Sequence, residues 1–258
     1  MYSITPTRKK IALIVGILLS LLFVVIFSAY GWLQSNSGKQ QLVRWIEAAA
    51  NNGDTKLAIG SLEGSVPSAM VLTDIWVSDS AGVWLKVDRV EYRWHPWSLL
   101  KGLFRVEELA IQTVDLLRKP ILPETEIEAP PQENSEPFTG IPVALSIDRL
   151  VAEKIRLGET VLGEEVQLTL NSQMAYLGLS EGLLLNLNLK RIDQTPGKVD
   201  LEISFLPLSK TFVMGLNAEE PAGGLLVHAL QVPDLPEMSA IIKGEGTLDD
   251  WQGRFNFH

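Results

Sequence analysis

Residues 183–205 read LLLNLNLKRIDQTPGKVDLEISF, and the alternation within them decides the fold class. Every second residue from 183 to 189 is leucine, and Asn186 and Asn188 alternate with these leucines. After a short break the same period returns over 199–205. A period of two residues is typical of a strand with one dry face and one wet face. The stretch therefore predicts two neighbouring, half-buried strands of a β-sheet.

The same period recurs on both sides of this stretch, at short intervals along the chain. It is clear from Val83 to Val87, and it then shifts by one residue to Val90, which predicts a β-bulge near Asp88-Arg89. No long helical pattern separates the strands, so antiparallel meanders are favoured over βαβ units. We therefore expect a mostly β fold built on one curled antiparallel sheet, which forms a taco-like groove.

The apolar side of the later strands is the candidate functional surface. Two interpretations are open, because a closed sandwich core and an open groove for acyl chains both need one dry face. The candidate groove residues are Val166, Leu168, Leu170, Leu183, Leu185, Leu187, Leu189, Val199, Leu201, Ile203 and Phe205.

The N-terminus predicts a membrane anchor. Residues 11–33 are uncharged and mostly apolar, and about 20 such residues in a helix span the hydrocarbon core of a bilayer. The run is longer than the apolar region of a cleaved signal peptide, so we expect an uncleaved single-pass helix. Arg8, Lys9 and Lys10 precede it within the tail 1–10, which predicts a cytoplasmic N-terminus and a periplasmic remainder.

Two further segments complete the predicted organisation. Lys39–Asn51 has an apolar stripe and predicts a short amphipathic helix, which either plugs the near end of the β structure or lies on the membrane. Residues 120–142 hold six prolines, five glutamates and no basic residue, which predicts a surface loop, with an acidic docking loop as the functional alternative. This loop divides a first β segment, 39–119, from a second, 143–258, which we expect to continue the same sheet.

Composition excludes several classes of function. The net charge of −9 argues against a nucleic-acid partner, because such partners need basic patches. Cysteine is absent, which excludes thiolate chemistry and fits an envelope protein that folds by its core alone. The histidines His95, His228 and His258 are far apart, and no nucleophile or phosphate-binding motif is present. We expect a protein that is not an enzyme and that has no catalytic residue, metal site or cofactor.

Several segments, in this order and spacing, resemble the N-terminal region of the TamB family within the larger AsmA-like group. TamB proteins are the inner-membrane subunits of the translocation and assembly module. The segments that carry the resemblance are 60–64, 72–88, 94–102, 224–226, 235–238 and 243–251, and the anchor and loop positions agree.

The resemblance implies an anchored subunit at the bacterial inner membrane that acts in outer-membrane biogenesis. It implies autotransporter assembly and phospholipid transport between membranes, and it favours the groove over the closed core. The implied partners are phospholipid acyl chains and either the outer-membrane barrel TamA or a C-terminal TamB-like chain. About twelve strands extend only about 60 Å, so we expect a truncated or split form. The alternative is an envelope scaffold that binds precursors or a second chain by strand addition.

Overall fold

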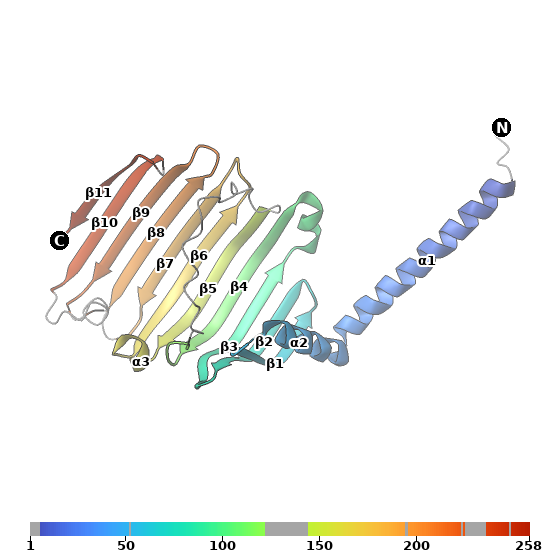
Figure 1. The fold of residues 1–258 in the computed structure, drawn as a ribbon, viewed down its shortest axis with the longest axis horizontal. Coiled ribbons are helices and arrows are strands. Elements are labelled where there is room, and N and C mark those ends of the chain that lie inside the picture. The colour runs from blue at the N-terminus through green and yellow to red at the C-terminus, as the bar shows by residue number, and fades with distance from the viewer. Residues whose placement is uncertain are drawn as a thin grey trace.

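The computed structural model describes residues 6–51, 53–121, 144–193, 196–222, 224, 236–247 and 249–258, with side chains from residue 13 onward. Helix α1 (Pro6–Gln34) projects away from the β structure (Figure 1). The part of this helix from Leu13 to Gln34 is long and apolar enough to cross a membrane, and no residue of its most apolar 18-residue stretch is buried. Arg8, Lys9 and Lys10 fall in the first turns of α1, but their side chains lie outside the described part.

Helix α2 (Asn36–Ala50) follows at once and contacts the first strand. It begins three residues before the predicted start, because the Ser35 hydroxyl caps it by accepting the Gly38 N–H at 3.2 Å. Within the predicted apolar stripe, Leu42, Val43 and Ile46 are half-buried, whereas Ala49 and Ala50 are exposed.

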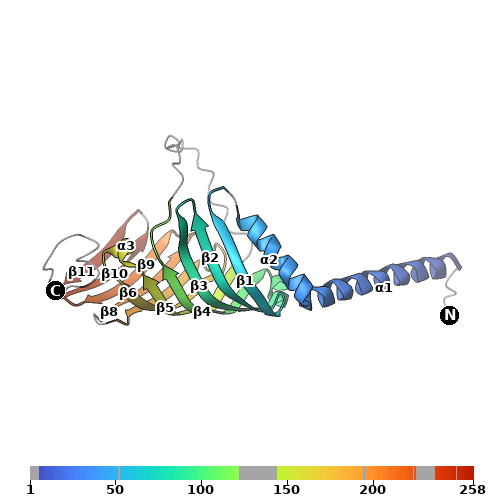
Figure 2. The same cartoon turned by 90° about the horizontal axis from the view of Figure 1, so that it is seen from below.

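In the part of the chain that the structure describes, eleven strands form one open sheet in which each strand pairs with its neighbours in the sequence (Figure 1). The strands are β1 (Lys56–Ser65), β2 (Ala69–Asp79), β3 (Gly82–Trp94), β4 (Leu103–Leu116), β5 (Ala144–Leu157), β6 (Val166–Tyr176), β7 (Leu183–Arg191), β8 (Gly197–Leu206), β9 (Thr211–Glu220), β10 (Met238–Thr247) and β11 (Trp251–Phe257). Short helices η1 (Pro96–Lys101) and α3 (Glu159–Leu162) lie between strands. The sheet twists along its length, so β1 to β3 stand steeper than the last strands in Figure 2.

The prediction of a wholly antiparallel sheet is wrong at one pair, because β4 and β5 run parallel. Phe104 lies opposite Leu145, and Leu116 lies opposite Leu157. A parallel pair needs a long connection that returns the chain to the start of the first strand. The predicted loop 120–142 lies in this connection, and its residues from 122 onward are outside the described part.

The phase shift predicted near Asp88-Arg89 takes a different form in the structure. Val87 and Val90 lie on one face, opposite Ile75 and Leu72 of β2, and the register between these strands does not change there. Both strands carry the same irregularity at this point. The register of β3 changes elsewhere, near Val83 in its pairing with β2 and between Arg93 and Trp94 in its pairing with β4.

The sheet is a single layer, and this limits its core. Among the described residues only eight apolar side chains are buried, namely Leu62, Val66, Val87, Val106, Ala152, Val166, Leu168 and Tyr176. A sandwich would bury most of its inward residues between two sheets. The described part therefore does not form the closed two-sheet core that the sequence left open as an alternative.

Candidate functional site

The strand registers place all the candidate groove residues on one face of the sheet. Leu185 of β7 lies opposite Ile203 of β8 and opposite Met174 of β6. Cross-strand partners point to the same side of a sheet, so each such row is a continuous apolar contact. The same reasoning joins Leu187 to Leu201. Leu189 lies opposite both Leu170 and Val199, and Leu183 lies opposite Phe205. Leu168 and Val166 lie on the same side of β6 as Leu170, and Val166 is opposite Leu157 of β5.

This side of the sheet, named here the apolar face, continues over all eleven strands. Its additional members are Leu57, Ile59, Leu62, Leu72, Ile75, Val77, Leu85, Val87, Val90, Leu109, Ile111, Val114, Leu150, Ala152, Ile155, Met214, Leu216, Ala218, Ala240, Ile242, Phe255 and Phe257. The sequence indicated the strands, but only the register shows that their apolar sides coincide.

Most of the candidate residues are incompletely covered. Val166 is fully buried and Leu168 is nearly so, whereas the other nine candidates on β6, β7 and β8 are half-buried. Apolar surface that remains accessible to water is unfavourable by about 25 cal/mol per Å². A contiguous surface of this kind commonly marks a binding site.

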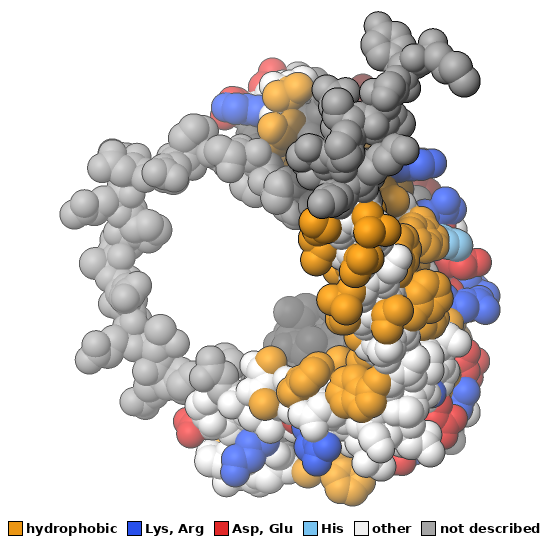
Figure 3. Space-filling model, turned by 90° about the vertical axis from the view of Figure 1, so that its right-hand side faces the viewer, with side chains coloured by type: hydrophobic (Ala, Val, Ile, Leu, Met, Phe, Trp, Pro, Cys, Tyr) orange, Lys and Arg blue, Asp and Glu red, His pale blue; other side chains and the backbone are white. Residues whose placement is uncertain are grey.

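A hollow of about 200 Å³, open to solvent, lies on the apolar face over β6 to β11. Leu189, Val199, Ala218 and Ala240 line it in one cross-strand row. Viewed from the α1 end, the described part curves around an open central space, and most of its visible charged side chains lie on the outer side of this curve (Figure 3).

Aromatic rings cover the apolar face near its last strands. The Trp251 ring is 6.3 Å from the Phe212 ring and 6.2 Å from the Phe255 ring, measured between centroids. This ring also occupies the space above Gly244 and Gly253, where an added Cβ would lie 2.1 Å and 2.4 Å from it. The two glycines therefore let the indole lie against the backbone of β10 and β11.

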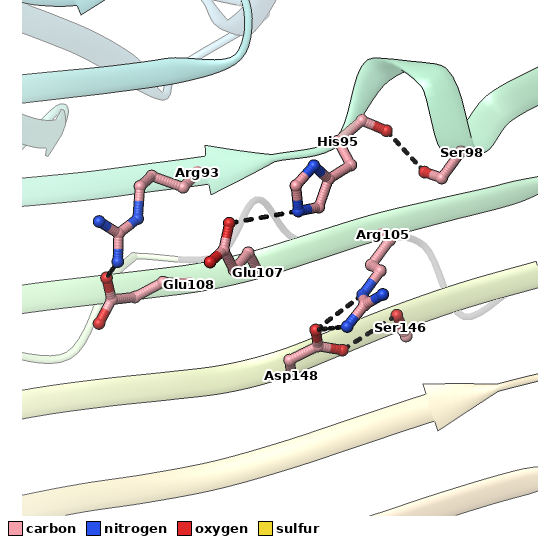
Figure 4. A network of polar contacts seen from close by, with 8 residues as sticks. All are labelled: Arg93, His95, Ser98, Arg105, Glu107, Glu108, Ser146 and Asp148. Atoms are coloured by element: carbon pink, nitrogen blue, oxygen red, sulfur yellow. Dashed lines mark hydrogen bonds and ion pairs between the residues drawn. The ribbon is translucent and has the colours of Figure 1, made fainter.

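The opposite side, named here the polar face, is crossed by ion pairs between adjacent strands. Glu108 of β4 bonds to Arg93 of β3 and, at 2.9 Å, to Arg149 of β5. Arg105 bonds to Asp148 at 2.7 Å, and Figure 4 shows Arg93 and Arg105 each reaching toward a carboxylate of the adjacent strand. Most of these groups are partly exposed, so each pair stabilises the sheet only modestly.

His95 has one carboxylate partner within ion-pair distance. Its Nε2 is 3.3 Å from Glu107 Oε2, and both side chains are about half exposed. The Ser98 hydroxyl donates to the backbone oxygen of His95 at 2.6 Å and not to the ring (Figure 4). In the described part of the chain, no group of three or more His, Asp or Glu side chains is placed to hold a metal ion.

One titratable group on the sheet is strongly perturbed. Arg118 donates to the Asp79 carboxylate, as do the backbone N–H groups of Ile121 and Ala81, both at 2.8 Å. The Arg118 hydrogen bond, followed by that from Ile121, holds the pKa of Asp79 well below its ordinary value. The contact ties the end of β2 to the segment after β4, so its role is to position strands.

No protein-family model matches the chain, and no curated protein or solved structure matches it. The fold and the apolar face of the described residues therefore define the class directly: a helix that is long and apolar enough to cross a membrane, followed by a single-layered, open β-sheet with one apolar side.

Proposed function

We propose that this protein carries phospholipid acyl chains along the apolar face, which acts as a taco-like groove. The observation that supports this most strongly is one row of cross-strand partners, from Leu62 on β1 through Leu189 on β7 to Phe257 on β11, which is apolar on all eleven described strands and has no second layer over it in the described part. The ten spacings between the described strands, each about 4.8 Å, make this path about 48 Å long from the first strand to the last. Each methylene group that leaves water on such a surface contributes about 0.8 kcal/mol, which is sufficient to hold an acyl chain.

The setting that we propose follows the resemblance to the TamB family. Helix α1 anchors the chain in the bacterial inner membrane with Arg8, Lys9 and Lys10 on the cytoplasmic side, and the sheet extends into the periplasm. There it acts in outer-membrane biogenesis, in phospholipid transport and autotransporter assembly, with TamA or a C-terminal TamB-like chain as its partner. Helix α2 is the amphipathic plug at the near end, which is consistent with its contact with β1.

A pair of identical substitutions on adjacent residues tests this function. Leu185 lies on the apolar face, whereas Leu184 is 46% exposed on the polar face. We expect Leu185→Asn to reduce co-purified phospholipid at least fivefold, because it places an amide in the acyl path, and Leu184→Asn to leave it unchanged. Phospholipid is quantified by mass spectrometry and folding by circular dichroism. A folded Leu185→Asn protein with normal lipid content would reject the function, and so would unfolding of this variant alone, which would indicate a closed core.

A second function, strand addition to a partner chain, is supported by the two edges of the sheet. At β1 the outward N–H groups of Leu57 and Ile59 are satisfied by Asn51 and Glu47 near the end of α2. At the other edge, β11 pairs with β10 alone among the described strands. Ser239 and His258 exchange both backbone bonds, so by alternation the N–H of Phe255 points to the open edge. An exposed edge of this kind can receive a further strand.

The strand-addition function predicts that Phe255→Pro abolishes capture of outer-membrane barrel precursors, because proline removes the edge donor. Phe255→Ala keeps this donor and is the matched control. Pull-down and lipid content are measured on the same preparations. Loss of capture in Phe255→Pro alone, with lipid content unchanged, supports strand addition, whereas normal capture by Phe255→Pro refutes it.

A further inference from the structure

A buried arginine interrupts the apolar face beside the hollow. Arg191 continues the odd-numbered series 183–189 on β7, and it lies opposite Leu168 of β6 and Gly197 of β8. Its side chain is only 5% exposed, and it lines the hollow together with Leu189 and Val199. Burying a guanidinium on an apolar surface is unfavourable unless its donors are used.

One carboxylate accepts a hydrogen bond from this donor set, and a second lies within ion-pair distance of it. Arg191 Nη2 is 3.0 Å from Glu164 Oε1, and Arg191 Nε donates to Asp193 Oδ1 at 2.7 Å. The second carboxylate oxygen of Asp193 accepts the Gln167 N–H at 3.0 Å, which fixes the pair to β6. The guanidinium is therefore held in one orientation before any ligand arrives.

The remaining nitrogen is unused. Arg191 Nη1 is buried and has no hydrogen-bond partner among the described residues. An arginine that served only to brace the strands would be expected to have its donors satisfied, because an unsatisfied buried N–H destabilises the fold. Because the Arg191 side chain lines the hollow, a ligand oxygen that reached this nitrogen would supply the missing acceptor.

The charges around the hollow indicate the kind of headgroup. Arg191 contributes one positive charge, while Glu164 and Asp193 contribute two negative charges within ion-pair distance of it. Glu220 also lines the hollow, as do Lys198 and Glu219, which pair with each other at 3.1 Å. The surplus of carboxylate disfavours a headgroup with net negative charge and favours one that carries an ammonium group beside its phosphate.

We propose that Arg191 binds the phosphate of a zwitterionic aminophospholipid, whose ammonium faces the carboxylates and whose acyl chains lie along Leu189, Val199 and Ala218. The site rests on the proposed acyl-chain function and adds headgroup selection to it. Arginine suits this role because its planar donors match phosphate oxygens. The apolar row supplies affinity without selectivity, and the guanidinium supplies selectivity.

The test uses the full chain in nanodiscs and three probes with the same photoreactive acyl chain: phosphatidylethanolamine, phosphatidylglycerol and the free fatty acid. Adducts are counted by mass spectrometry. For the wild type we expect at least fivefold more phosphatidylethanolamine than phosphatidylglycerol adducts. A triple variant, Arg191→Met with Glu164→Gln and Asp193→Asn, removes the cation without leaving carboxylates unpaired. We expect it to lose the preference and to keep its fatty-acid adducts.

The outcomes separate this site from the function on which it rests. Wild-type adducts with an unchanged headgroup preference in the triple variant would overturn the role of Arg191 and leave the acyl path intact. Absence of adducts from all three probes on the wild type would overturn both. Arg191→Lys keeps the charge but not the planar fork, and we expect it to retain less than half of the phosphatidylethanolamine preference.

Discussion

The Glu47 carboxylate accepts the backbone N–H of Ile59 at 2.8 Å, so a helix side chain occupies the place of a neighbouring strand. Asn51 does the same for the N–H of Leu57 at 2.5 Å. Gln34, the last residue of α1, bonds to both the N–H and the carbonyl oxygen of Val66. Side chains thereby bond to backbone groups along the first edge of the sheet, next to the helix that is long and apolar enough to cross a membrane.

Glu47→Ala is expected to open this edge. Loss of the hydrogen bond to Ile59 should lower the free energy of unfolding by about 1–2 kcal/mol, because a charged acceptor is removed. Amide hydrogen exchange measures the effect directly, with faster exchange at Ile59. Glu47→Gln retains an acceptor and should exchange nearly as slowly as the wild type. Unchanged protection of Ile59 in Glu47→Ala would show that the helix does not cap β1.

Gly244→Ala is expected to destabilise the sheet by about 1–3 kcal/mol, because its methyl group would lie 2.1 Å from the Trp251 ring and force it to move. Thermal unfolding followed by tryptophan fluorescence reports both stability and indole environment. Gly215→Ala is the matched control in the adjacent strand β9, where the nearest side-chain atom is 3.9 Å away. Equal effects of the two substitutions would contradict the packing of Trp251 over Gly244.

Asp79→Asn is expected to give a pH-dependent loss of stability. The pKa of Asp79 is lowered in the folded chain, so its ion pair with Arg118 contributes fully above the unfolded pKa of about 3.9. As the pH falls below about 4, protonation of the unfolded state removes this contribution. The difference in Tm between wild type and variant should be constant from about pH 5 to 8 and shrink from about pH 4 to 2.

Arg118→Gln is the companion variant for Asp79, since it removes the strongest cause of the lowered pKa. Its difference from the wild type should shrink over the same acidic range. A difference that stays constant below pH 4 in both variants would mean that the Asp79 carboxylate is not held ionised by Arg118.

The sequence was sufficient for the features that depend on local periodicity. The alternation around Leu185 identifies which residues share a face, and the uncharged run 11–33 identifies the apolar helix, because both patterns lie within single elements. It also contained the position of Arg191, which follows the leucines at the same parity. That signal was missed because a basic residue at a strand end is usually solvated.

The features that depend on long-range pairing could not be read in the same way. Alternation is identical in parallel and antiparallel strands, so the parallel pairing of β4 with β5 has no local signal. The relation of Trp251 to Gly244 requires the register of β10 and β11. The shared irregularity at Val87 and Val90 requires the neighbouring strands, since a phase shift in one sequence looks like an isolated bulge.

Lipid photo-crosslinking in cells tests the acyl-chain function most directly. A photoreactive residue is placed at Leu185 on the apolar face and, as the control, at Asn186, which is exposed on the polar face. We expect phospholipid adducts at position 185 and none at position 186. Adducts at neither position in a folded protein, or equal adducts at both, would contradict an acyl-chain path on the apolar face.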